Sequence, residues 1–122
     1  MRPHEKLDVW KKAIELVLSV YAETRQFPMD ERFGLTSQIR RAVVSIPANI
    51  AEGAARRSRK EFANFLSIAQ GSASELETEL LIAHRLRYLD EVNYLRLLRE
   101  IDDISRMITG LGHHLKDKDR EP

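Results

Sequence analysis

Residues 33–79 read FGLTSQIRRAVVSIPANIAEGAARRSRKEFANFLSIAQGSASELETE, and this stretch decides the fold. It predicts two consecutive helices, because residues repeat at alternating steps of three and four on each side of a short basic turn, which is the spacing of one helix face. Ser58 and Glu61 have the S-x-x-E spacing of a capping box, so the second helix is expected to begin there. The first face consists of Leu35, Ile39, Ala42, Ile46, Asn49 and Gly53, and the second of Phe62, Leu66, Ala69, Ala73, Leu76, Leu80 and Ala83.

The same spacing predicts one helix before this stretch and one after it. Pro28 marks the loop that follows the first of these helices, and Asp90 is a candidate N-cap for the last. We place Leu16 and Val20 beside the first seam rather than on it. The first seam is Leu7, Trp10, Ile14, Val17, Tyr21 and Thr24, and the last is Leu97, Ile101, Ile104, Ile108, Leu111 and Leu115.

Together these patterns predict a single all-α domain over residues 1–122, with helices at about 5–25, 35–56, 59–87 and 91–115. Short loops between helices of this length favour an antiparallel, up-down four-helix bundle, and a 3.5-residue repeat favours left-handed packing. Pro47 interrupts the second helix. It cannot donate to the carbonyl of Val43, so we expect a kink there, either inside one helix or where a new helical piece begins.

Composition limits the classes of function. The chain has no cysteine, and its 20 Lys and Arg residues against 19 Asp and Glu give a net charge of only +1. Binding to a polyanion would therefore depend on a local patch and not on the field of the whole protein. No signal sequence and no run of about 20 apolar residues is present, which predicts a bacterial cytoplasmic protein with no membrane partner.

The sequence contains no pattern typical of a catalytic or metal site. Carboxylate-bridged metal sites in helix bundles use Glu-x-x-His pairs, and none occurs here. The glycines lack the spacing of a phosphate-binding loop, and no serine lies in a nucleophile motif. We therefore expect a protein that is not an enzyme and that holds no metal or other cofactor.

Polar residues interrupt the two seams of residues 33–79. We predict that they form a structural polar network that fixes the register of the two helices. Arg40 and Arg41 are the expected cations opposite Glu75 and Glu79, which lie four residues apart and repel each other. The network consists of Ser45, Asn49, Glu52, Ser72, Glu75 and Glu79.

Four cations lie within five residues between the two helices. Such a run is often only solvated, but repeated around a symmetric oligomer it would form a basic ring able to contact phosphates. Arg40 and Arg41 are added as further candidates for nucleic-acid binding. The cations of the turn are Arg56, Arg57, Arg59 and Lys60.

Apolar residues also lie outside the seams on several helices. A globular helix uses about three apolar positions per heptad, so some of these residues broaden the core. Surplus apolar surface on several faces commonly marks an interface, and we expect self-association. The residues are Val44, Ile68, Leu81, Ile82, Leu95 and Leu98.

Several motifs occur in the order and spacing of a known family. They are L-T-x-Q-I-R-R-A at 35–42, S-I-P-A-N-I-A-E-G at 45–53 and G-S-A-x-E-L-E-T at 71–78, and L-x-V-W at 7–10 also fits. The chain therefore resembles, over nearly its whole length, the four-helix-bundle proteins encoded by intervening sequences in bacterial 23S ribosomal RNA genes. The resemblance implies a left-handed up-down bundle that assembles into a homopentameric ring.

Accessory variability proteins of diversity-generating retroelements are relatives in this fold, and they are basic rings that bind nucleic acid and a reverse transcriptase. The present chain is much less basic, so that function does not transfer directly. The leading hypothesis is a non-enzymatic oligomer that binds RNA or DNA through a ring of loop cations. The alternatives are a protein-binding scaffold with no nucleic-acid role, and a small-molecule or metal site around Asn49, Glu52 and Glu75.

Overall fold

The computed structural model describes residues 1–120, and every regular element in that range is helical, which confirms the all-α prediction. Two short 3-10 helices, η1 (Pro3–Lys6) and η2 (Met29–Glu31), precede the first and second long helices. The long helices are α1 (Asp8–Thr24), α2 (Leu35–Ala54), α3 (Arg59–Arg85) and α4 (Glu91–Arg120). Compared with the expected ranges, α1 begins later because η1 forms first, and α4 continues beyond residue 115.

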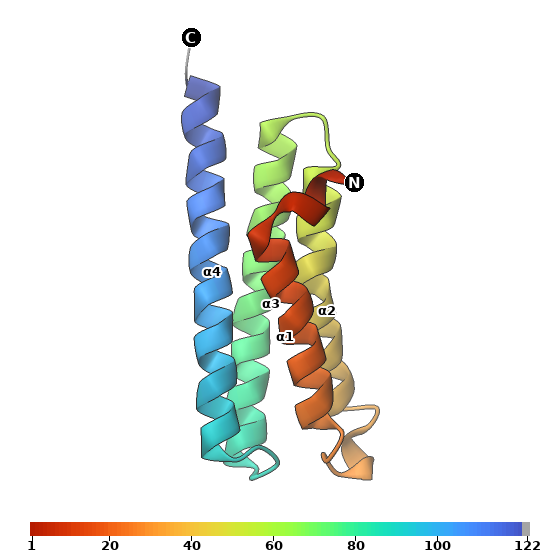
Figure 1. Cartoon of the computed structure of the whole chain (residues 1–122). Helices are drawn as coiled ribbons and strands as arrows, with labels where there is room; N and C mark the ends of the chain where they lie inside the picture. The colour runs from red at the N-terminus through yellow and green to blue at the C-terminus, as the bar shows by residue number, and fades with distance from the viewer. Residues whose placement is uncertain (121–122) are drawn as a thin grey trace.

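The helices run alternately up and down, as expected for a four-helix bundle (Figure 1). Each long helix contacts two others in the order α1, α2, α3, α4 and back to α1. Within residues 1–120, α1 has no contact with α3, and α2 has none with α4, so these are the diagonal pairs. The turn between α2 and α3 lies at the same end of the bundle as the N-terminus and the C-terminal part of α4 (Figure 1).

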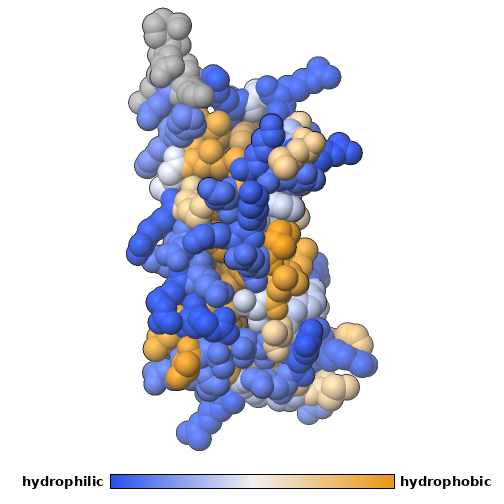
Figure 2. All heavy atoms as spheres, viewed as in Figure 1, coloured by the Kyte–Doolittle hydropathy of each residue, from blue (hydrophilic) through white to orange (hydrophobic). Residues whose placement is uncertain are grey.

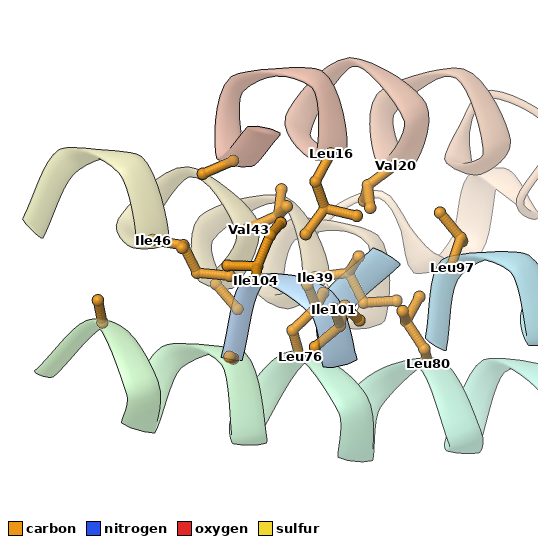
Figure 3. Close-up of a cluster of buried hydrophobic side chains, with 14 of the residues drawn as sticks. Leu16, Val20, Ile39, Val43, Ile46, Leu76, Leu80, Leu97, Ile101 and Ile104 are labelled. Atoms are coloured by element: carbon orange, nitrogen blue, oxygen red, sulfur yellow. The ribbon is translucent and has the colours of Figure 1, made fainter. Parts of the chain in front are cut away.

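The core combines large aliphatic side chains from all four long helices with several alanines (Figure 3). Leu16 and Val20 from α1 meet Ile39 and Val43 from α2, opposite Leu76 from α3 (Figure 3). The predicted seams of α3 and α4 are buried apart from one half-buried residue in each, Phe62 and Leu111. Burial of this apolar surface is the main favourable term in the stability of the fold.

The predicted seam of the first helix is only partly right, since Thr24 is buried and Leu7, Trp10 and Val17 are half-buried against the core. The buried face of α1 is Val9, Ala13, Leu16, Val20 and Thr24, whereas Ile14 and Tyr21 are both 36% exposed. Two stripes with the same spacing overlap on this helix, and we chose the one with the larger side chains. The core instead uses the stripe that contains the small residue Ala13. Leu16 and Val20, which we placed beside the seam, are fully buried core residues.

Pro47 lies inside α2 and is buried, and the helix continues on both sides of it from Leu35 to Ala54. Pro47 therefore does not begin a new helical piece. Both expected N-caps are present, because the Ser58 hydroxyl accepts from the Glu61 amide at 3.1 Å and Asp90 accepts from the Asn93 amide at 2.7 Å. No helix within residues 1–120 is long and apolar enough to cross a membrane.

Candidate nucleic-acid interface

The basic turn, which we define as Arg56, Arg57, Arg59 and Lys60, joins α2 to α3 at one end of the bundle (Figure 1). All four side chains are exposed. The sequence forms a tight turn here because α2 ends at Ala54 and the cap of α3 follows at Ser58. The four cations are therefore held close together at the surface.

Gly53 brings the two helices close together next to the basic turn. A Cβ atom at this position would lie 2.8 Å from the Cβ of Phe65, 2.9 Å from the Cδ1 of Phe62 and 3.2 Å from the carbonyl oxygen of Phe62. Contacts this short between carbon atoms are repulsive. The last turn of α2 therefore needs glycine in order to pack against the first turns of α3.

Two of the cations in the basic turn differ in how they are held. The Arg56 guanidinium lies 2.6 Å from the Glu52 carboxylate and 4.9 Å from the centre of the Phe65 ring. Arg57 and Lys60 have no side-chain partner within the part of the chain that the structure describes. Arg56 is thus partly neutralised and restrained, while Arg57 and Lys60 have charges available to an anion.

Glu52 accordingly pairs with the basic turn, although the spacing predicted it in the polar network. Its carboxylate forms an exposed ion pair with Arg56, four residues later and just beyond the end of α2. An exposed pair of this kind stabilises a fold by about 0.5 kcal/mol or less. Its main effect is on the charge and position of Arg56.

The other predicted network residues lie on the facing sides of α2 and α3 and include a chain of hydrogen bonds. The Asn49 amide donates to both the carbonyl and the hydroxyl of Ser45, at 2.8 and 2.9 Å. The hydroxyl oxygens of Ser45 and Ser72 lie 2.8 Å apart, and Ser72 donates to the Ile68 carbonyl at 3.2 Å. Since the single proton of Ser72 is used on Ile68, Ser45 must donate to Ser72.

Glu75 and Glu79 form a second polar cluster further along α3. Glu79 is only 5% exposed, and its Oε1 atom is buried with no hydrogen-bond partner within the described residues. Burial, and then the charge of Glu75 and a hydrogen bond with it, raise the pKa of Glu79 to about 7. Near neutral pH this carboxyl group is therefore protonated in a large fraction of the molecules.

Arg40 and Arg41 do not both face these carboxylates. Arg40 turns toward α1, where its Nε donates to the Thr24 hydroxyl at 3.0 Å and its guanidinium lies 4.5 Å from the centre of the Tyr21 ring. Arg41 is exposed and shares a surface hollow with Glu75. Adjacent residues on a helix point about 100° apart, so Arg40 reaches α1, while Arg41 lies on the outer surface of α2 and borders hollows on both sides.

A groove runs along the surface between α1 and α2, with a volume of about 570 Å³. Tyr21 on α1 and Val44 on α2 form parts of its wall, and Arg32 and Phe33 come from the connection between the helices. Arg40 and Arg41 also line it. We did not predict this groove, although an Arg-Phe pair in a loop, unused by any helix seam, was a visible signal.

Apolar side chains are exposed on several helices. In the view of Figure 2 they form separate hydrophobic areas on a mostly hydrophilic surface. Among them Leu18 on α1 is 66% exposed, and Ile68 and Ile82 on α3 are 51% and 44% exposed. Of the surplus residues named from the sequence, Val44 and Leu95 are exposed as well, whereas Leu81 and Leu98 are half-buried.

Metal ligands are not gathered at any of these places. No group of three or more His, Cys, Asp and Glu residues within the described part of the chain could hold a metal ion. The carboxylates of Glu52 and Glu75, which we considered as ligands together with Asn49, have different neighbours, since Glu52 pairs with Arg56 and Glu75 contacts Glu79.

Comparison with known proteins gives a match to a family model and matches to solved structures. Residues 5–110 match the family model described as 23S rRNA-intervening sequence protein. The fold is similar to the crystal structure of a protein with unknown function from the S23 ribosomal protein family of Bacteroides thetaiotaomicron VPI-5482, with a TM-score of 0.76 and 27% sequence identity. That match covers 84% of this chain and 96% of the other. No curated protein matches the sequence significantly.

Proposed function

The chain belongs to the 23S rRNA-intervening sequence protein family, and we propose that it is a non-enzymatic, oligomeric four-helix-bundle protein that binds RNA or DNA through the basic turn. The observation that carries this proposal is the pair of exposed cations Arg57 and Lys60, which have no side-chain partner within the described residues. They lie beside Arg56 and Arg59 on a turn held by tight helix packing.

Contacts to phosphate groups explain how such a turn would act. Lysine and arginine side chains neutralise phosphates and release the cations condensed on the nucleic acid, so affinity falls as salt rises. These contacts position the protein but carry little sequence information. Arg56 would contribute less than Arg57 or Lys60, because Glu52 already offsets its charge.

The proposal includes self-association, because a ring would repeat the basic turn at one end of the assembly. Leu18 on α1 and Ile82 on α3 are exposed on two helices that are diagonally opposed in the bundle. A contact between two different faces of one chain is heterologous and can close into a ring. We propose a homo-oligomeric ring, and the resemblance described above points to a pentamer.

Two finer features of the bundle belong to this proposal. The 3.5-residue repeat of α3 and α4 supports left-handed packing of the helices. The buried Pro47 leaves the Val43 carbonyl without its usual donor inside α2, which supports a bend at that turn.

The decisive experiment measures the binding of a short RNA by fluorescence anisotropy at several salt concentrations. A variant with Arg56, Arg57, Arg59 and Lys60 all changed to alanine should lose most of its affinity, and its dependence of log K on log salt should flatten. The matched control removes the same charge from exposed cations on other parts of the surface, Lys11, Arg25, Arg85 and Arg99.

The result that supports the proposal is a loss in the variant of the basic turn and near-normal binding in the control. Equal losses in both would show that only net charge matters. Absence of RNA and DNA binding by the unmodified protein at low salt would overturn the proposal.

A protein-binding scaffold is the second candidate, and one observation favours it. The α1–α2 and α3–α4 connections lie at the end of the bundle opposite the basic turn (Figure 1), and large apolar side chains are exposed beside them, with Phe33 85% and Val92 78% exposed. Surfaces of this kind commonly contact another protein. Capture of the same protein partner after nuclease treatment, with no binding to purified RNA or DNA, would favour this function over the first.

A further inference from the structure

The groove between α1 and α2 combines positive charge with aromatic rings. Three guanidinium groups line it, from Arg32, Arg40 and Arg41, together with the rings of Tyr21 and Phe33. No carboxylate is among its lining residues. Its volume of about 570 Å³ lies in the range of about 300–1,000 Å³ that is usual for sites that bind organic ligands.

Two acidic side chains lie beside the groove: Glu75 shares a neighbouring hollow with Arg41, and Glu31 is already engaged elsewhere. Glu31 precedes Arg32 in the chain, but its Oε1 accepts from the Leu35 amide at 3.3 Å and its Oε2 accepts from the Tyr88 hydroxyl at 3.0 Å. Both carboxylate oxygens of Glu31 are therefore occupied, one by the first amide of α2 and the other by Tyr88. The groove keeps a positive charge that an anionic ligand would complement.

Each of the two rings has a guanidinium group over one face, and the ring of Phe33 remains open to a flat ligand. The Arg32 guanidinium lies 4.6 Å from the centre of the Phe33 ring, and that of Arg40 lies 4.5 Å from the centre of the Tyr21 ring. Phe33 is nevertheless 85% exposed, so most of its surface remains open. A fully apolar occupant would have to desolvate the neighbouring guanidinium groups without compensating them, which is costly.

Nucleobases linked by phosphates match both properties. Proteins that bind single strands use a positively charged groove along the backbone and aromatic side chains on which bases stack. A duplex would not fit this chemistry, since its bases are already stacked and paired. The groove includes Arg32 and Phe33, which precede the start of α2 at Leu35, whereas the basic turn follows its end at Ala54.

We infer that the groove between α1 and α2 binds a single-stranded segment of nucleic acid, with a base stacked on Phe33 and phosphates bound by Arg32 and Arg41. This inference rests on the proposed nucleic-acid binding and deepens it by naming the strand type. The basic turn would contact the backbone of any nucleic acid, whereas the groove would distinguish single strands from duplexes.

The test compares Phe33→Ala with Phe33→Trp in the full chain, using a uridine oligonucleotide and an RNA duplex of equal length. Because base stacking on one aromatic ring contributes substantially, we expect Phe33→Ala to weaken single-strand binding about tenfold and to leave duplex binding unchanged. Phe33→Trp should retain single-strand binding, and its added fluorescence should be quenched by the oligonucleotide but not by the duplex. Light scattering of each variant gives the oligomeric state.

Three results would overturn the inference. They are unchanged single-strand binding by Phe33→Ala, equal losses for single strand and duplex, and a lower assembly mass, which would make the groove a contact between copies of the chain. The quadruple alanine variant of the basic turn separates the two proposals. If that variant binds normally while Phe33→Ala does not, nucleic acid binds at the groove and not at the basic turn. The reverse pattern supports binding at the basic turn alone.

Discussion

The hydroxyl oxygens of Ser45 and Ser72 lie 2.8 Å apart and join α2 to α3. The proton order is fixed by their neighbours, since Asn49 donates to Ser45, Ser45 to Ser72, and Ser72 to the Ile68 carbonyl. Each group in such a chain polarises the next one. The two helices therefore have one preferred register at this level of the bundle.

Replacing either serine with alanine should destabilise the protein by about 1 kcal/mol or more, because both hydrogen bonds of its hydroxyl group are lost, including the one between the two serines. The double variant Ser45→Ala with Ser72→Ala should cost less than the sum of the two, since both remove the same bond. Urea unfolding of the four proteins in the cycle measures this coupling. Strictly additive losses would show that the two hydroxyls do not interact.

The close approach of α2 and α3 at Gly53 gives a second prediction. Gly53→Ala places a Cβ 2.8 Å from the Cβ of Phe65, so the helices must separate and stability should fall by about 1–3 kcal/mol. Gly71→Ala is the matched control in α3, because nothing lies within 4 Å of its Cβ. That change should raise stability by up to about 1 kcal/mol, since alanine favours helix. Thermal unfolding of both variants tests the difference.

The buried carboxyl group of Glu79 predicts a pH dependence of stability. Its pKa is about 7 in the folded chain and 4.5 when unperturbed, so the folded state binds the proton more tightly. The stabilising effect of this proton is complete below the unfolded pKa and is lost as pH rises from 4.5 toward 7. Glu79→Gln mimics the protonated group, and it should be near neutral at about pH 4 and stabilising by on the order of 2 kcal/mol at about pH 8.

The control for that prediction is Glu77→Gln, an exposed glutamate on the same helix. Its effect on the free energy of unfolding should vary much less with pH, because no comparable burial acts on it. Chemical denaturation of both variants across this pH range supplies the measurement. A Glu79→Gln variant whose advantage does not grow with pH would show that the carboxyl group finds a partner or water that the structure does not contain.

Sequence reasoning was most accurate for α3 and α4, where each helix offers a single stripe of apolar residues. On α1 two stripes overlap one residue apart, and the choice between them depends on which side chains fit against three other helices. Ala13 occupies the buried stripe because it is small, while the larger Ile14 remains 36% exposed. A helix pattern contains no information about that competition.

The polar residues show a similar limit. Spacing placed Ser45 and Ser72 in one network, and the structure joins them directly. The pairing of Arg40 with Thr24 and Tyr21 could not be predicted, because it depends on the angle between α1 and α2. The α1–α2 groove is assembled from three separate segments of chain, so the Arg32-Phe33 pair in the loop could not reveal it alone.

The last prediction concerns assembly of the proposed ring, in which the α1 face of one chain contacts the different α3 face of the next. Leu18→Lys places a charge on α1, and Ile82→Lys places one on the diagonally opposed α3. A buried, unpaired ammonium group is strongly unfavourable, so each variant alone should be monomeric by light scattering. Val92→Lys, at an exposed position on α4, is the control and should keep the mass of the unmodified protein.

Mixing the two lysine variants then tests whether the contact joins unlike faces. The Leu18→Lys chain keeps an intact α3 face and the Ile82→Lys chain keeps an intact α1 face, so one good contact can form between them but no ring can close. The mixture should therefore contain a heterodimer. If Leu18→Lys dissociates the oligomer while Ile82→Lys has no effect, the contact is between two α1 faces, and an isologous dimer replaces the ring.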